Sequence, residues 1–223
     1  GFRNINIGLN AGKDNQTGER NIFLGYNAGG ELDGNDKDDC IFIGSQSGLN
    51  ANQHDLIFVG KNSGQNNTTG QNNLFLGTQA GMANVSSNNN IYIGKNAAYR
   101  NTTGNNTVIG SDALSSGTVV ENTCACGFEA GKDSTGDNNI FFGSQAGSDF
   151  NTNNSIIIGQ LAGQNVQANN NILIGQSAGK IVGGEDNIAI GNNALLSSVN
   201  ILNNTGINNI CIGSSSGTSL TSG

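Results

Sequence analysis

The chain has 223 residues, of which 35 are glycine and 11% are charged, and its formal net charge is −7. The nine Lys and Arg residues are scattered singly, so the sequence lacks the clustered cations that bind nucleic-acid phosphates or anionic lipid. No apolar run approaches the roughly 20 residues of a membrane-spanning helix. We therefore predict no nucleic-acid partner and no membrane span in this segment. Only 35% of the residues are hydrophobic, so a core requires them at regular intervals.

A glycine recurs through the whole chain at intervals of 16 to 22 residues, most of them 16 or 17. Repetition at such a period is typical of a solenoid, in which each repeat buries its apolar face only by stacking on its neighbours. We predict an all-β fold, a parallel β-solenoid (β-roll) of about thirteen coils of 16–17 residues, as a single array over residues 1–223. Because the chain starts in mid-pattern, we interpret it as a fragment of a longer fibre protein. The recurring residues are Gly8, Gly25, Gly44, Gly60, Gly77, Gly94, Gly110, Gly127, Gly143, Gly159, Gly175, Gly191 and Gly213.

Three largely apolar residues precede each recurring glycine, as in Ile22-Phe23-Leu24 before Gly25. The first and third are Ile, Leu or Val in most coils, which favours a strand over a helix, and they share one face of that strand. We expect this face to line the interior of the coil. Three cysteines in these triplets, Cys124, Cys126 and Cys211, are interpreted as small buried hydrophobes. The triplets occupy residues 5–7, 22–24, 41–43, 57–59, 74–76, 91–93, 107–109, 124–126, 140–142, 156–158, 172–174, 188–190 and 210–212.

The segments between the triplets are polar and contain the turns. Glycine has no substitute at the recurring position, which predicts a positive φ or a close approach of two backbones there. Three residues later every coil has Ala or Ser, for example Ala28 or Ser216, which predicts a narrow interior where the chain turns. Asn or Asp stands before most strands, as at Asn72 and Asn89. We expect these side chains to hydrogen-bond from coil to coil in a column.

The middle residue of each triplet leads to a prediction about assembly. By alternation it is expected to point away from the coil interior, which would expose a stripe of aromatic side chains. Soluble monomers rarely expose an apolar patch of more than a few hundred Å². We therefore predict a homotrimer around the long axis, and leave open a dimer or a cover supplied by the same chain. The predicted trimer interface comprises Phe23, Phe42, Phe58, Phe75, Tyr92, Val108, Phe141, Ile157 and Leu173.

Two segments carry a resemblance to known proteins: Asn21 to Gly29, with the sequence NIFLGYNAG, and Asn187 to Gly191, with the sequence NIAIG. They resemble the Asn-x-x-Ile-Gly-x-x-Ala/Ser repeat of trimeric autotransporter adhesin heads. The Asn-Thr-Thr-Gly turns before such strands are also similar to repeat regions of phage and viral tail-fibre proteins. The resemblance implies a left-handed, trimeric β-roll that is displayed outside a cell or on a virion.

Candidate residues for chemistry are few. We predict no catalytic residues, no cofactor and no enzymatic activity, because the acidic residues do not recur at one spacing. The single histidine, His54, is expected to be a solvated loop residue. An acidic cluster has oxygen ligands at alternate positions, as Ca²⁺ requires, but Lys37 stands where another oxygen is needed. It is therefore a weak calcium candidate beside its interpretation as a solvated turn, and its members are Asp33, Asn35, Asp36, Asp38 and Asp39.

Two functions follow from these predictions. The first is a structural and adhesive fibre segment on a cell or virion surface, which mediates attachment as a stiff trimeric rod. The alternative is a receptor- or glycan-binding head that uses the longer loops at 31–39 and 195–208. The predicted partners are other copies of the chain and an unidentified surface receptor or glycan. An ice- or mineral-binding solenoid would need a regular outer column of Thr, and the Thr residues here are irregular.

Overall fold

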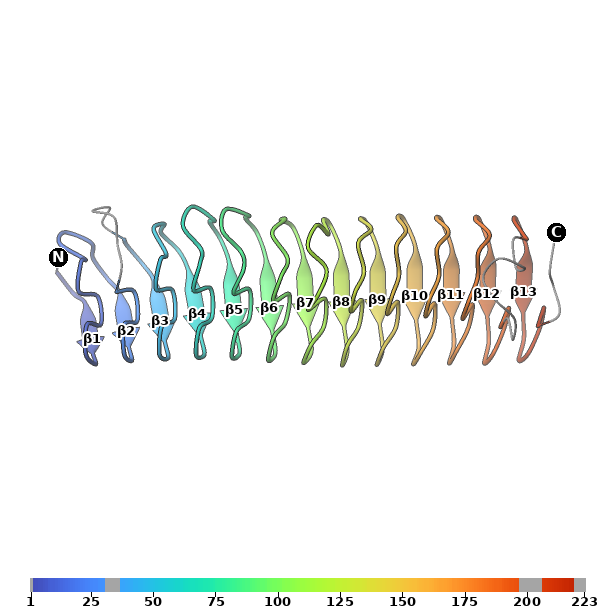
Figure 1. Cartoon of the computed structure of the whole chain (residues 1–223), viewed down its shortest axis with the longest axis horizontal. Helices are drawn as coiled ribbons and strands as arrows, with labels where there is room; N and C mark the ends of the chain where they lie inside the picture. The colour runs from blue at the N-terminus through green and yellow to red at the C-terminus, as the bar shows by residue number, and fades with distance from the viewer. Residues whose placement is uncertain (1, 31–36, 197–205, 219–223) are drawn as a thin grey trace. The chain divides into compact units, whose positions relative to one another are not determined.

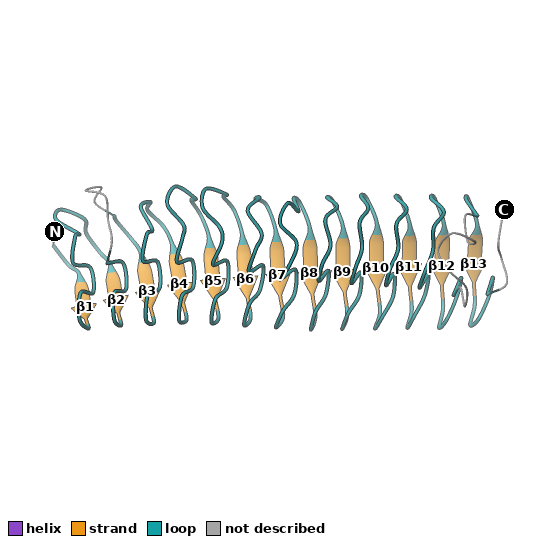
Figure 2. Cartoon of the chain, in the orientation of Figure 1, coloured by secondary structure: helices purple, strands orange, loops and turns teal. Residues whose placement is uncertain are grey.

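A computed structural model of the chain describes residues 2–30, 37–196 and 206–218. These residues form short strands and turns, with no helix among them (Figure 2). The described part of the chain accordingly contains no helix of the length and hydropathy that a membrane crossing requires. Its thirteen strands are β1 Ile5–Ile7, β2 Ile22–Leu24, β3 Ile41–Ile43, β4 Ile57–Val59, β5 Leu74–Leu76, β6 Ile91–Ile93, β7 Thr107–Ile109, β8 Cys124–Cys126, β9 Ile140–Phe142, β10 Ile156–Ile158, β11 Ile172–Ile174, β12 Ile188–Ile190 and β13 Ile210–Ile212.

The chain divides into two compact units, Gly1–Thr118 with strands β1 to β7 and Val119–Gly223 with strands β8 to β13. Within each unit every strand pairs in parallel with its neighbours in the sequence, as Figure 1 shows. The register places equivalent triplet positions opposite each other, for example Phe42 opposite Phe58. Each column of the sequence repeat is therefore a column in space, which confirms the predicted parallel β-solenoid. Whether the whole chain behaves as a single array stays a prediction.

The recurring glycine has both of the features that were predicted as alternatives, a positive φ and a close approach of two backbones. Its φ lies between +122° and +143° in every coil, a region that side chains rarely adopt. It also contacts the same glycine of the next coil, because a Cβ added to Gly25 would lie 2.6 Å from the carbonyl oxygen of Gly44. Alanine at this position would meet strain and a backbone clash together.

Two further positions of the coil adopt left-handed backbone conformations, which explains the abundance of Asn and Asp. The first lies two residues before the strand, such as Asn72 with φ of 56°. The other lies two residues after the recurring glycine, such as Asn96 with φ of 55°. Asn and Asp tolerate this conformation better than other residues with side chains. The polar composition is therefore a requirement of the backbone path.

The middle residue of each triplet points into the coil, so the prediction that it faces outward is wrong. Phe23, Phe42, Phe58, Phe75 and Tyr92 form a stack inside the first unit, with centroids of successive rings 4.7–5.2 Å apart and interplanar angles of 6–16°. All nine residues assigned to the trimer interface are fully buried within a single chain, namely Phe23, Phe42, Phe58, Phe75, Tyr92, Val108, Phe141, Ile157 and Leu173. These residues therefore form the core and cannot form an interface between subunits.

The physical reason is the narrowness of the interior. The turn after each strand passes close over the strand, and its Ala and Gly residues leave room for one large side chain per coil. Ala80 is fully buried, and a Cβ added to Gly81 would lie 2.6 Å from the ring of Phe75. Two aliphatic side chains per strand would not fit in this space. The single middle residue therefore points inward, and its two neighbours point outward.

In two coils the turn compensates for a small core residue of the strand. In the coil of β7 the middle residue is Val108, and the turn carries the fully buried Leu114 at the position that is Gly81 two coils earlier. In the coil of β12 the middle residue is Ala189, and Leu195 fills the same turn position with 2% exposure. In these two coils the turn thus replaces part of the core volume that the strand lacks, as close packing requires.

Asparagine side chains link successive coils in two adjacent columns. The predicted exposed column is confirmed, because Asn72 Nδ2 donates to Asn89 Oδ1 at 3.3 Å and Asn89 Nδ2 donates to Asn105 Oδ1 at 3.2 Å. A second column, one residue later, is buried. There the backbone N–H of Asn90 donates to Asn73 Oδ1 at 3.0 Å, and the N–H of Asn106 donates to Asn90 Oδ1 at 3.0 Å. These bonds satisfy backbone donors that the interior would otherwise leave unpaired.

Candidate functional site

An apolar strip on the outside of the strands is the first candidate site. The first and third residues of each triplet form two parallel columns of aliphatic side chains, and Ile91 and Leu76 remain 40% and 43% exposed. In the described strands these two columns contain no charged side chain. We call them the outer strip. Its most exposed members are Ile5, Ile7, Leu24, Ile57, Leu76, Ile91 and Ile109 in the first unit and Ile140, Phe142, Ile190, Ile210 and Ile212 in the second.

Two thiols interrupt the outer strip on β8. Cys124 and Cys126 are half-buried and lie on the same face of the strand, so the prediction that they are buried hydrophobes is wrong. Burial and the neighbouring Cys126 raise the pKa of Cys124 above its ordinary value. Cys211 is buried as expected, and so is Cys40, whose burial raises its pKa to about 11. All four cysteines are free thiols.

The acidic cluster is only partly described. Asp33, Asn35 and Asp36 lie outside the described residues. Asp39 accepts two hydrogen bonds from Arg20, at 2.6 Å from Nε and 2.8 Å from an Nη, and this pair holds the pKa of Asp39 below its ordinary value. Among the described residues no three His, Cys, Asp or Glu side chains are arranged to hold a metal ion. The carboxylate of Asp39 is thus engaged by a cation of the neighbouring coil.

His54 links two coils. Its Nδ1 accepts a hydrogen bond from the backbone N–H of Asp38 at 2.9 Å, and its side chain is half-exposed. The same backbone position in other coils donates to a side-chain oxygen instead, as Gln71 N–H does to Asn88 Oδ1 at 2.7 Å. His54 therefore substitutes for an Asn in a structural column.

The two longer loops, proposed as the binding surface of a head, fall mostly outside the described residues, which stop at Gly30 and Leu196 and resume at Lys37 and Gly206. The alternative that a head binds through 31–39 and 195–208 stays a prediction. At the start of the second loop, Leu195 belongs to the core.

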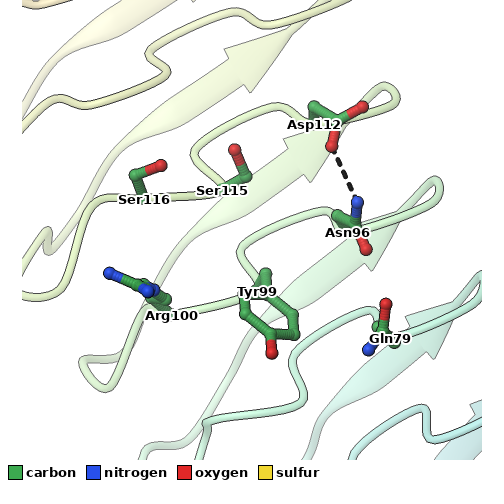
Figure 3. Close-up of a pocket in the computed structure, with 7 residues that line it drawn as sticks. All are labelled: Gln79, Asn96, Tyr99, Arg100, Asp112, Ser115 and Ser116. Atoms are coloured by element: carbon green, nitrogen blue, oxygen red, sulfur yellow. Dashed lines mark hydrogen bonds between the residues drawn. The ribbon is translucent and has the colours of Figure 1, made fainter.

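A polar depression on the turns of β5, β6 and β7 is the second candidate site, and the sequence analysis did not find it. It has a volume of about 370 Å³, and its residues come from three successive turns (Figure 3). Tyr99 and Arg100 extend from one turn, and Ser115 and Ser116 lie at the equivalent positions of the next. The complete lining is Gln79, Asn96, Tyr99, Arg100, Asp112, Ser115 and Ser116.

The depression results from a step in side-chain size between two coils. Tyr99 occupies the fifth position after its glycine, where other described coils have residues such as Gln65, Lys132 or Ser148. The next coil has Ser115 at this position, so a large ring adjoins a small hydroxyl. The step from a large to a small side chain in this variable column is the signal that the sequence contained.

Compared with known proteins, the chain matches no protein-family model, no curated protein and no solved structure at a significant level. Function is therefore argued from the outer strip and the depression.

Proposed function

We propose that the chain is a structural and adhesive fibre segment that assembles as a homotrimer through its outer strip, at the surface of a cell or virion. The observation that supports this proposal is the strip itself, which exposes aliphatic side chains on strand after strand without a charge. It replaces the aromatic column as the surface that another subunit would cover. The resemblance to adhesin heads and tail fibres supports a left-handed coil and the extracellular location.

The energy available from the strip is of the same order as the entropic cost of association. Full burial of an Ile or Leu side chain contributes roughly 1.5–3 kcal/mol. Since the seven most exposed members of the first unit retain 38–58% of their accessible surface, covering each contributes about 1 kcal/mol. The first unit alone therefore offers about 7 kcal/mol per subunit, within the range of the entropic cost of association.

Symmetry favours a rotation axis along the stack of coils. A strip that meets the same strip of another copy in parallel requires rotational symmetry about an axis beside it. Three-fold closure excludes the strip from water in all subunits at once. A two-fold arrangement is the competing outcome of the experiment below.

The test is the mass of the chain in solution, measured by light scattering after size exclusion. We expect three times the chain mass of 22.8 kDa. Changing Ile91 and Ile93 together to Lys places charges in the strip and should yield a folded monomer. The matched control is Thr69→Lys with Ser86→Lys, which adds the same charge at exposed turn positions outside the strip and should leave the trimer intact. A monomeric or dimeric parent chain would refute the trimer.

A further inference from the structure

The depression beside Tyr99 combines an aromatic ring, a free cation and hydroxyl-binding groups. The half-buried ring of Tyr99 forms a wall of the depression (Figure 3). Its hydroxyl has no hydrogen-bond partner among the described residues. Arg100 is exposed, and no ion pair involves it in the described part of the chain. An unpaired guanidinium beside an aromatic wall is otherwise rare on this sparsely charged surface.

The opposite side of the depression is held in place by hydrogen bonds between turns. Asn96 Nδ2 donates to Asp112 Oδ1 at 2.8 Å, and Ser111 Oγ donates to Asp112 Oδ2 at 2.9 Å. These two bonds fix the orientation of the Asp112 carboxylate at the rim. An ionised carboxylate has about four lone-pair sites and accepts hydrogen bonds only, so its chemistry suits a ligand with hydroxyl groups.

The stretch of chain that contains the depression has a net charge of opposite sign to that of the whole chain. Residues 56–118 contain three cations (Lys61, Lys95 and Arg100) and one anion (Asp112), a local balance of +2, whereas the whole chain carries −7. The depression itself is lined by one cation, Arg100, and one anion, Asp112, so an anionic group of a ligand is attracted at the Arg100 end and repelled at the Asp112 end.

We propose that this depression binds one sugar ring that carries a carboxylate, as in a uronic acid residue of a surface glycan. The C–H face of a pyranose packs on the electron-rich face of the Tyr99 ring. The guanidinium of Arg100 matches a carboxylate with two parallel hydrogen bonds. Asp112 accepts from ring hydroxyls, and the small Ser115 and Ser116 leave space for the ring. The volume of about 370 Å³ is at the lower end of the roughly 300–1,000 Å³ of ligand pockets, which fits a single residue of a glycan.

This site is separate from the proposed subunit interface. Its residues belong to turns, and none stands in the outer strip. Sugar binding and trimer formation can therefore be tested independently, and a failure of one does not imply a failure of the other.

The experiment is saturation-transfer NMR of the full chain with methyl β-D-glucuronide, compared with methyl β-D-glucoside and with acetate. We expect saturable binding of the glucuronide, with the strongest transfer to the ring C–H protons. The neutral glucoside should bind at least about tenfold more weakly, because it lacks the charge-assisted hydrogen bonds to Arg100. Acetate lacks the sugar ring and should bind more weakly as well.

Four variants complete the experiment. Arg100→Gln should reduce the affinity for the glucuronide to that for the glucoside, and Tyr99→Ser should weaken both sugars. Arg3→Gln and Tyr26→Ser change exposed residues of the same types outside the depression and should bind like the parent chain. Equal affinity for the two sugars, unchanged affinity in Arg100→Gln, acetate binding as tight as the glucuronide, or no saturable binding of the glucuronide would each overturn the proposal.

Discussion

Replacement of Phe58 by Ala tests which face of the strand forms the core. Phe58 is fully buried between the rings of Phe42 and Phe75, at centroid distances of 5.2 Å and 4.7 Å. Gly64 of the turn has no side chain that could fill the cavity left by the ring. Its backbone also packs against the neighbouring coils, so the turn cannot collapse into that cavity. The substitution therefore removes two ring contacts and leaves a void.

The expected loss of stability is large. Removal of a buried Phe side chain costs about 3–5 kcal/mol, and each lost aromatic pair accounts for about 0.5–1.5 kcal/mol beyond burial. We expect a value near the upper end, about 5 kcal/mol, which is a third or more of the total free energy of unfolding of an ordinary domain. The neighbouring Ile57 is 39% exposed on the outer strip. Ile57→Ala should cost about 1–2 kcal/mol within a single chain.

The assay is urea denaturation followed by circular dichroism at several protein concentrations. Phe58→Ala should lower the unfolding midpoint by the same amount at every concentration, because its contacts lie within one chain. The effect of Ile57→Ala should grow with concentration, since it also weakens association between chains. If Phe58→Ala costs no more than Ile57→Ala in dilute solution, or if it dissociates the assembly without lowering stability, the assignment of the core is wrong.

Three further predictions concern the glycine and the thiols. Gly77→Ala should destabilise the protein by several kcal/mol, roughly the sum of a strained backbone and a steric clash with Gly94, whereas Thr78→Ala beside it should be nearly neutral in the same denaturation assay. Because burial raises the pKa of Cys40 from 9.0 to about 11, the folded state retains a proton that the unfolded state loses, so stability should fall as pH rises from about 9 to 11. The fall attributable to Cys40, at most roughly 2–3 kcal/mol, should disappear in Cys40→Ala when thermal unfolding is compared across this pH range; an unchanged slope would contradict the burial effect. A maleimide at neutral pH should label Cys124 and Cys126 rapidly in the monomeric variant that has Lys at positions 91 and 93. Labelling should be slower in the parent chain, because other subunits would cover the two thiols. Equal labelling rates by mass spectrometry would argue against that cover.

The repeat alone determined the strands, the turns and the role of the glycine. The triplets coincide with β1 to β13 because a short β-branched segment bounded by Asn and Gly has no alternative local structure. The need for positive φ at the recurring glycine also follows from its lack of any substitute. These features depend on residues that are close in the sequence, so periodicity was sufficient to predict them.

The direction of the strand faces required the tertiary structure. Alternation shows that Ile22 and Leu24 share one face and that Phe23 has the other, but all three are apolar, so hydrophobicity does not indicate which face is covered. Closure of the coil decided it. The turn brings Ala28 and Gly29 over the strand and leaves space for the ring of Phe23 alone.

The depression depended on the tertiary structure for a related reason. Tyr99 and Ser115 are 16 residues apart, and only the stacking of coils makes them neighbours. Their sequence positions identify an irregular column, but not that a ring, a guanidinium and a carboxylate enclose one space. The sequence determined the regular coil, and the stacking of unequal side chains on that coil decided where a ligand can bind.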